Sequence, residues 1–299
     1  MQLVNCLRQE GRYMRYIMVL KSQICSIAAS SLEQKTIKQE LWKKLILCAN
    51  GFATQFIKDR KYTRAIEMLE LCTDMLPSIY IQSENCRQEL NGLIQDTHAY
   101  YYSRRGKPSA ALQYIISASN SEKQRIAKTR EKGGNQHDTS KHAQGSALLH
   151  LARYHIHRAS ILQQLHRFGD AMKYLQRVLS MVDLYLRHGT YTSSTAQEAH
   201  PGQKKAIGTD DPDITVMVAV AHHNLAVIQI LMGHIGDACI SSQNCRKLCR
   251  LCMSVSSGYV SVFEETHMKA LCEMSSMLRN KQTKEEALVF QKLVVELFD

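Results

Sequence analysis

Ten cysteines and 13 histidines are the side chains of this sequence best suited to metal binding or nucleophilic chemistry. The densest group is Cys245, Cys249 and Cys252, whose spacing places all three on one face of a helix. A tetrahedral zinc site would need a further ligand, for which the candidates are Cys239, Cys272 and His267. Structural zinc ligands usually come from loops that let two pairs converge, and three thiols on one helix converge poorly. Because cysteine is also a common small, buried helix residue, we predict packing and no metal.

The remaining candidates for catalysis lack a recognised arrangement. His222-His223 and the group His150, His155 and His157 have no Glu at metalloprotease spacing. The acidic pairs Glu264-Glu265 and Glu285-Glu286 lie beside lysines, as expected of exposed helix surfaces. The sequence contains no Gly-rich phosphate loop, no G-x-S-x-G motif and no kinase signature. We therefore expect a protein that is not an enzyme and that uses no cofactor.

Composition favours a helical protein. The 299 residues are 44% apolar, which is enough to bury a core, and include only 4 Pro and 14 Gly. So few turn formers argue against a β-sandwich or barrel, which needs a turn signal every 8 to 12 residues. Cysteines that fall in helical segments, without the spacing of a disulfide framework, suit a reducing compartment. No apolar run reaches the roughly 18 residues of a membrane span, so we expect a cytoplasmic protein.

Apolar residues recur at three- and four-residue steps almost throughout, which predicts an all-α protein. The predicted helices cover 3–29, 33–59, 62–76, 79–105, 108–130, 146–166, 169–187, 213–233, 236–255, 258–279 and 283–298. Two stretches rich in polar residues, 119–146 and 188–213, are predicted to be long exposed loops. The organisation expected is an N-terminal capping segment (1–40), an array of helical hairpins (41–255) and a C-terminal capping hairpin (256–299).

A repeat defines the array. Four times an alanine is followed twelve residues later by another, with a turn between them: Ala53 and Ala65, Ala99 and Ala111, Ala159 and Ala171, Ala226 and Ala238. Large, mostly apolar residues, or Pro108, stand three positions before the second alanine, and small or apolar residues stand seven after it. Twelve residues carry a chain through the end of one helix, a tight turn and the start of the next. Two small side chains then meet where helices cross at about 8–10 Å, and stacked hairpins make an α-α superhelix.

This pattern resembles the tetratricopeptide repeat. The first unit matches the family signature at Ala49, Phe52, Ala53, Phe56, Tyr62, Ala65, Leu69, Cys72 and Pro77, and the fourth at Leu225, Ala226, Gly233 and Ala238. The stretch 208–214 is similar to the connector of kinesin-light-chain-like repeats. The second alanines are 46, 60 and 67 residues apart, whereas the family repeats every 34 residues. Longer helices and inserted loops are therefore expected.

The resemblance implies a concave groove lined by the first helix of each hairpin. Carried over, the positions facing a ligand are Asn50, Thr54 and Lys58; Asp96, Tyr100 and Arg104; Arg153, His157, Ser160 and Gln164; and His223, Asn224 and Val227. Lys58, Arg104 and Arg153 make this wall basic, which suits an acidic peptide or subunit surface. Family members that bind chaperone C-termini carry a Lys and an Asn in the first hairpin. The corresponding residues here are Asn50 and Thr54, which disfavours a chaperone adaptor.

The net charge of +11 is concentrated: residues 1–187 carry +13, 188–213 carry −2 and 214–299 are neutral. A basic surface attracts acidic partners by long-range electrostatics. The function expected is a protein-interaction scaffold or adaptor in a multiprotein assembly, linked to the cytoskeleton or to motors through the connector likeness. The alternative is a helical repeat that binds nucleic acid, in which case binding weakens steeply with salt.

Overall fold

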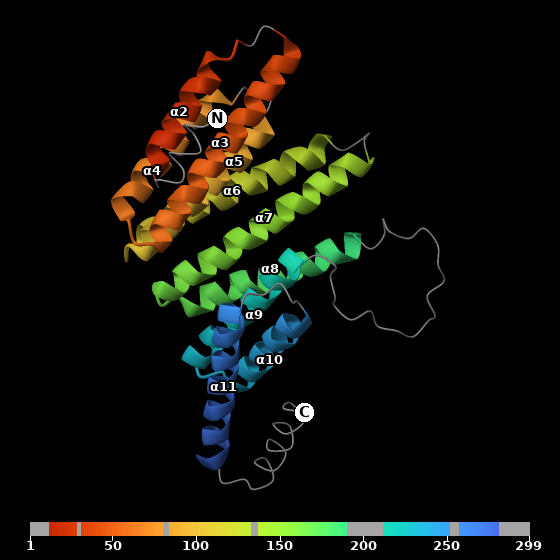
Figure 1. Ribbon diagram of the computed structural model, residues 1–299. Coiled ribbons are helices and arrows are strands. Elements are labelled where there is room, and N and C mark those ends of the chain that lie inside the picture. The colour runs from red at the N-terminus through yellow and green to blue at the C-terminus, as the bar shows by residue number, and fades with distance from the viewer. Residues whose placement is uncertain are drawn as a thin grey trace. The chain divides into compact units, whose positions relative to one another are not determined.

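The computed structural model describes residues 12–28, 31–79, 84–132, 137–189, 212–251 and 257–280, and every element in these ranges is helical (Figure 1). The chain divides into two compact units, Met1–Ile161 and Leu162–Asp299. This division falls inside the predicted array of 41–255. The limits of the array, residues 41 and 255, remain predictions.

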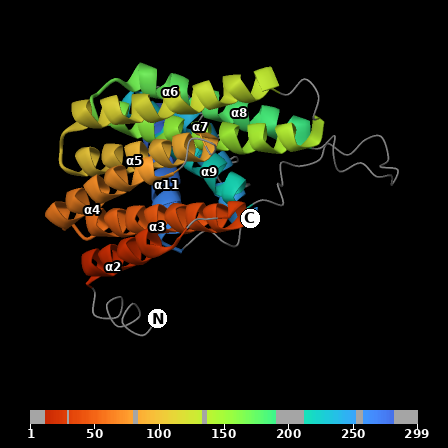
Figure 2. The ribbon, with the colours of Figure 1, turned by 90° about the horizontal axis from the view of Figure 1, so that it is seen from above.

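Unit 1 is built from α2 (Tyr13–Ser26), α3 (Leu32–Lys58), α4 (Tyr62–Met75), a short 3-10 turn η1 (Leu76–Ser78), α5 (Glu84–Arg104), α6 (Pro108–Lys132) and α7 (His137–Gln164), whose last residues belong to unit 2. Unit 2 continues with α8 (Phe168–Gly189), α9 (Pro212–Leu231), α10 (Ile235–Leu251) and α11 (Ser257–Asn280). Within unit 1, α3 packs on α4 and α5 packs on α6, as the view in Figure 2 shows. The predicted helix 283–298 and the start of the predicted helix 3–29 lie outside the described residues.

The loop predicted over 119–146 is wrong for most of its length, because α6 continues to Lys132 and α7 begins at His137. The segment looked polar, but its polar residues recur with the period of a helix. Ser119, Glu122 and Arg125 are 0%, 2% and 8% exposed and lie on the side of α6 that also buries Ile126. The other predicted loop, 188–213, overlaps the last two residues of α8 and the first two residues of α9. Residues 190–211 lie outside the described residues.

The repeated alanines form the packed centre of the hairpins. All eight are at most 1% exposed. The residues four and seven positions after each second alanine are buried as well: Leu69 and Cys72, Ile115 and Ala118, Leu175 and Val178, Ser242 and Cys245. Even Ser242, the exception to the apolar pattern, is 2% exposed. The sequence pattern therefore marks the buried face of each second helix, as predicted.

The four turns share one backbone geometry. The residue seven positions after each first alanine has a positive φ: Arg60 (60°), Gly106 (70°), His166 (57°) and Gly233 (77°). The next N–H donates back to a carbonyl five residues earlier, for example from Lys61 to Phe56 (2.8 Å). This bond belongs to the Schellman motif, which ends a helix with one left-handed residue. The second alanine's N–H then donates to the carbonyl four residues before it, as in Ala65 to Lys61 (3.1 Å), so the next helix starts at once.

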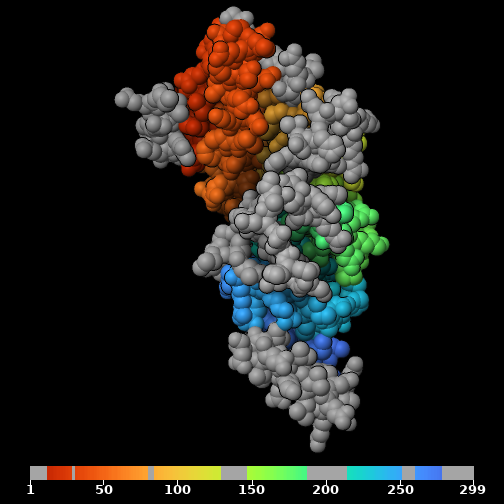
Figure 3. Space-filling model, turned by 90° about the vertical axis from the view of Figure 1, so that its right-hand side faces the viewer, coloured from red at the N-terminus to blue at the C-terminus, as the bar shows by residue number. Residues whose placement is uncertain are grey.

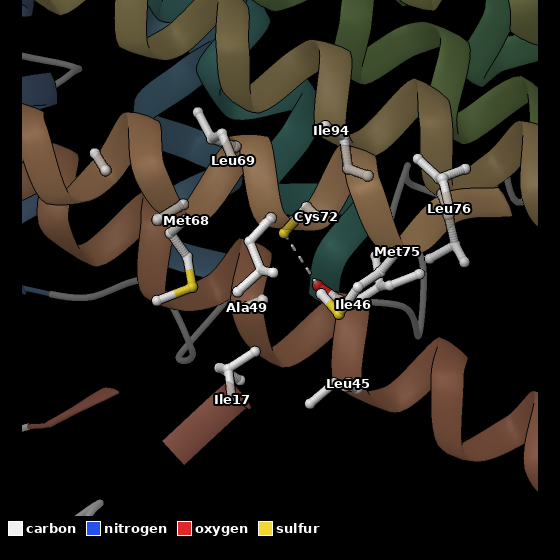
Figure 4. Packing of buried hydrophobic residues seen from close by; sticks show 14 of the residues in the cluster. Ile17, Leu45, Ile46, Ala49, Met68, Leu69, Cys72, Met75, Leu76 and Ile94 are labelled. Atoms are coloured by element: carbon white, nitrogen blue, oxygen red, sulfur yellow. Dashed lines mark hydrogen bonds between the residues drawn. The ribbon is translucent and has the colours of Figure 1, made fainter. Parts of the chain in front are cut away.

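The core of unit 1 is continuous from α2 to α5. Ile17, Ile46, Met68 and Ile94 come from four different helices and are all fully buried (Figure 4). Cys72 Sγ lies 3.8 Å from the Ile46 carbonyl oxygen, to which it donates. Burial, with a smaller effect of the neighbouring Cys48, raises the pKa of this thiol to about 12. Cys72 is therefore a packing residue that stays protonated at neutral pH.

The left-handed turn positions predict opposite effects of matched substitutions. An L-residue at positive φ costs about 1–2 kcal/mol, so Arg60→Gly is expected to stabilise the protein by about 0.5–1 kcal/mol after the entropy cost of glycine is subtracted. Gly106→Ala is expected to destabilise it by about 1 kcal/mol, because the added methyl meets nothing within 4 Å and only the backbone is strained. Urea denaturation of both variants measures the two changes; equal signs would show that the backbone conformation is not the cause.

Candidate functional site

The positions predicted to face a ligand in unit 1 come from α3, α5 and α7. Three of them meet. His157 Nδ1 on α7 lies 2.6 Å from Asp96 Oδ1 on α5, although the two residues are 61 apart in the chain. The ring of Tyr100, one turn after Asp96, stands edge-on to His157 with centroids 6.3 Å apart. The side chains of Asp96 and His157 are 29% and 20% exposed, so the pair is accessible from solvent.

The other predicted positions of unit 1 differ in exposure. Lys58, Arg104 and Arg153 are exposed, and α3, the orange-red segment, lies at the surface in Figure 3. Thr54 donates its hydroxyl to the Asn50 carbonyl (3.0 Å) and Ser160 is half-buried. The structure corrects the prediction that Asn50 faces a ligand. Its side chain is only 6% exposed, and its Oδ1 has no hydrogen-bond partner among the described residues. The three cations are therefore exposed, whereas Asn50 is packed inside the unit.

The predicted positions of unit 2 make a different environment. His223 on α9 packs its ring on Phe263 of α11, with centroids 4.8 Å apart. Asn224 and Val227 are half-buried, and Gln164, at the end of α7, is exposed. His223 belongs to the packing of α9 against α11 and not to the cluster around His157.

A buried charged network lies beside the site and was not predicted from the sequence. Arg125 on α6 donates from Nη2 to Glu122 Oε1 at 2.6 Å and from Nε to both Glu122 oxygens at 3.2 Å. Its Nη1 is 3.7 Å from Glu89 on α5, and Glu122 is 3.7 Å from His150 on α7. Burial opposes the charge on Arg125, but its bonds and charge contacts, chiefly with Glu122, raise its pKa above the usual value. The network joins α5, α6 and α7, the elements around the cluster.

Tyr154 on α7 is influenced by the charges of both the network and the cluster. It is 5% exposed, and a methyl group at Gly92 of α5 would lie 2.8 Å from its hydroxyl oxygen. Only glycine leaves room for this close approach of α5 and α7. Burial raises the Tyr154 pKa, and the charges of Asp96, Glu122 and Glu89 raise it further. The site is therefore held by fixed packing one and two turns away from Asp96 and His157.

Two cysteines of unit 2, Cys245 and Cys249, are core residues. Cys245 and Cys249 are buried. Burial raises the pKa of Cys245, and the neighbouring Cys249 raises it further. Cys239 donates to the Ala270 carbonyl (3.5 Å), Cys272 is exposed, and Cys252 lies outside the described residues. No group of three or more His, Cys, Asp or Glu gathers around a possible metal position in the described part of the chain.

One stretch corrects the expectation about apolar runs: Ile214–Leu231 of α9 is long and apolar enough, by length and composition, to cross a membrane. Half of it is buried, and α9 packs on α8, α10 and α11 within unit 2. The same composition is found in core helices of globular units. Its contacts account for the apolar character without a bilayer.

Buried histidines predict a loss of stability in mild acid. Burial lowers the pKa of His98, His222, His223 and His267 below the ordinary 6.5, and nearby Arg246 lowers it further for His267. The unfolded chain then binds protons that the folded chain does not, so stability is full above about pH 6.5 and falls as the pH drops below it. The melting temperature is expected to fall between pH 7.5 and 5.5. Replacing His222, His223 and His267 by Gln should flatten this dependence; an unchanged slope would contradict the assignment.

Comparison with known proteins gives a fold likeness. No family model matches the chain, and no curated protein matches it. Among solved structures, the chain is similar to the crystal structure of BtubC (BKLC) from P. vanneervenii, with a TM-score of 0.54, 14% sequence identity and coverage of 92% of each chain. At this identity the likeness shows the fold alone. The predicted class, an all-α helical repeat of the α-α superhelix type, is confirmed.

Proposed function

We propose that the chain is a noncatalytic scaffold of the tetratricopeptide repeat family that binds a protein partner on the α5–α7 face of unit 1. The observation that carries the proposal is the cluster of Asp96, Tyr100 and His157, which is partly exposed and is built from two first helices of successive hairpins. The spacing of the alanines and the shared turn geometry support the family. The likeness to BtubC (BKLC) supports a helical-repeat scaffold.

The chemistry of this face suits a polypeptide. With the Nδ1 proton of His157 directed to Asp96, Nε2 accepts a hydrogen bond, and a protonated ring donates from both nitrogens. The Tyr100 hydroxyl can donate and accept, so the cluster can pair with both groups of a peptide bond. Arg104 and Arg153 are exposed and can form bidentate bonds with carboxylates. The face therefore fits an extended or helical peptide that carries acidic residues.

The location proposed for the scaffold is the cytoplasm, in an assembly linked to the cytoskeleton or to motors. One support is that the cysteines fall in helical segments, without the spacing of a disulfide framework, which suits a reducing compartment. The other is the likeness of 208–214 to a kinesin-light-chain connector. Binding of nucleic acid is the competing function, motivated by the charge of residues 1–187. It predicts capture that nuclease abolishes and that falls steeply with salt.

The test compares partners recovered with the tagged full-length chain and with two charge-matched variants. The face variant carries Tyr100→Ala, Arg104→Glu and Arg153→Glu, and the control variant carries Gln113→Ala, Lys123→Glu and Lys128→Glu at exposed positions of α6. Recovery of the partners should fall about tenfold or more with the face variant, as the loss of one aromatic and two arginine contacts implies. They should be retained by the control. Equal recovery by both variants would reject this face as the binding site.

A further inference from the structure

The two hairpin turns of unit 1 carry a concentrated positive charge. In the α3–α4 turn and the first turn of α4 the exposed cations are Arg60, Lys61 and Arg64, and in the α5–α6 turn they are Arg105 and Lys107. These five residues are termed the turn edge. Asp59 is the only acidic residue in the segments 58–64 and 104–110. The turn edge therefore has a strong net positive charge.

Contacts between the turns bring these cations together. The Tyr62 hydroxyl at the start of α4 donates to the Arg104 carbonyl at the end of α5 (3.2 Å). The Arg105 guanidinium lies over the Tyr62 ring, 5.4 Å from its centroid. Both turns lie at the same end of unit 1 in the two ribbon views (Figure 1, Figure 2). The five cations therefore form one surface and not two separate ones.

The charge of the turn edge is poorly neutralised. Among its five cations, Lys61 alone pairs with a described carboxylate, Asp59, at 3.5 Å with the Lys61 side chain 53% exposed. The turns that belong to unit 2 differ. Arg167, in the turn before α8, is held by Asp170 at 2.7 Å, and residues 232–236 of the α9–α10 turn contain no Lys or Arg. The shared turn geometry does not require cations, so the unpaired charge of the turn edge needs another explanation.

We propose that the turn edge binds an acidic stretch of a polypeptide, rich in Asp and Glu. Clustered exposed cations raise the local concentration of anionic partners and speed their association. Proteins that bind single-stranded nucleic acid add free aromatic faces on which bases stack. Here Tyr62 is covered by Arg105 and by the edge contact with Tyr101 (6.1 Å), and Tyr102 stacks on Tyr114 (5.1 Å). Charge without free ring faces suits carboxylates better than bases.

This inference uses residues outside the α5–α7 face and rests on the proposed function only in taking a protein as partner. Arg104 is adjacent in sequence to the turn edge and belongs to the proposed face. A partner could therefore place an acidic stretch on the turn edge while another part of it occupies the face. The two surfaces can be tested separately, because they share no residue.

The experiment measures binding of a fluorescent poly-Glu peptide to the full-length chain by anisotropy. The edge variant carries Arg60→Glu, Lys61→Glu, Arg105→Glu and Lys107→Glu. A control variant with the same change of net charge carries Lys173→Glu, Lys247→Glu, Arg250→Glu and Lys269→Glu, all exposed in unit 2. Poly-Glu affinity should fall about tenfold in the edge variant, as the loss of four exposed ion-pair contacts implies, and less than threefold in the control. A second edge variant with four Gln substitutions should lose affinity as well, and circular dichroism checks its folding.

Three outcomes would overturn the proposal: an equal loss in the edge and control variants, unchanged affinity in a folded edge variant, or tighter binding of a single-stranded oligonucleotide of equal charge that the edge variant abolishes. The last outcome would assign the turn edge to nucleic acid. The face variant of Tyr100, Arg104 and Arg153, measured with the same peptide, separates the two proposals. Both proposals are supported if poly-Glu binding is reduced more by the edge variant than by the face variant, and if capture of cellular partners is reduced most by the face variant.

Discussion

Ala65→Leu is expected to lower the free energy of unfolding by about 3 kcal/mol or more, at the upper end of the usual range for overpacking. Ala65 is 0% exposed and lies in the same core as Ala53, also 0% exposed, on the facing helix of the hairpin. Three added carbons cannot fit without moving α4 away from α3, because the backbones at such a crossing approach to about 8–10 Å. Urea denaturation followed by circular dichroism gives the change.

The control is Glu67→Leu, which adds an apolar side chain at an exposed position of the same helix. Its effect should stay within about 0.5 kcal/mol. If both leucines are tolerated equally, the alanine does not lie at a close helix crossing and the hairpin explanation of the repeat is wrong.

Glu122→Leu should cost about 3–5 kcal/mol, the usual effect of removing one partner of a buried ion pair. The Arg125 side chain is only 10% exposed, and Glu89, at 3.7 Å, is the other carboxylate of the described residues with which it pairs. The cost therefore comes mainly from a buried guanidinium that loses its close hydrogen-bond acceptor. Equilibrium unfolding in urea measures it.

The double variant Glu122→Leu with Arg125→Met isolates this cause. Replacing a buried ion pair by apolar residues of similar volume is often neutral, so the double variant should be more stable than Glu122→Leu alone. A double variant at least as unstable as the single one would mean that Arg125 contributes through its other contacts and not through the buried charge.

The hairpins could be predicted from the sequence because a close helix crossing restricts side-chain size at fixed positions. Ala99 and Ala111 mark such a crossing on both sides of a turn, and Leu69 and Ile115 repeat the buried positions that follow. The left-handed geometry was harder to foresee. Gly106 and Gly233 signal it, whereas Arg60 and His166 adopt the same φ without a glycine. The shared hydrogen bonds of the turns impose the conformation there.

The candidate site was only partly predictable. The resemblance to the tetratricopeptide repeat implies that Asp96, Tyr100 and His157 face a ligand, but no local pattern specifies that Asp96 and His157 come within 2.6 Å. Burial of Asn50 depends on its packing within the unit, which the repeat pattern does not encode. Glu122 and Arg125 fall within both the predicted helix 108–130 and the predicted loop 119–146, and their charge does not reveal that the fold buries them. Their spacing of three residues, in phase with Ser119 and Ile126, is the signal that favours the predicted helix over the overlapping predicted loop.

The central claim is that a protein partner binds the α5–α7 face of unit 1, and site-specific photocrosslinking in cells tests it most directly. Benzoylphenylalanine is placed at Tyr100, or at Gln113 on the exposed surface of α6 as the control. The account predicts a light-dependent protein adduct from position 100 that Arg104→Glu with Arg153→Glu removes, and none from position 113. Adducts from position 113 alone, or adducts from position 100 that nuclease eliminates, would contradict it.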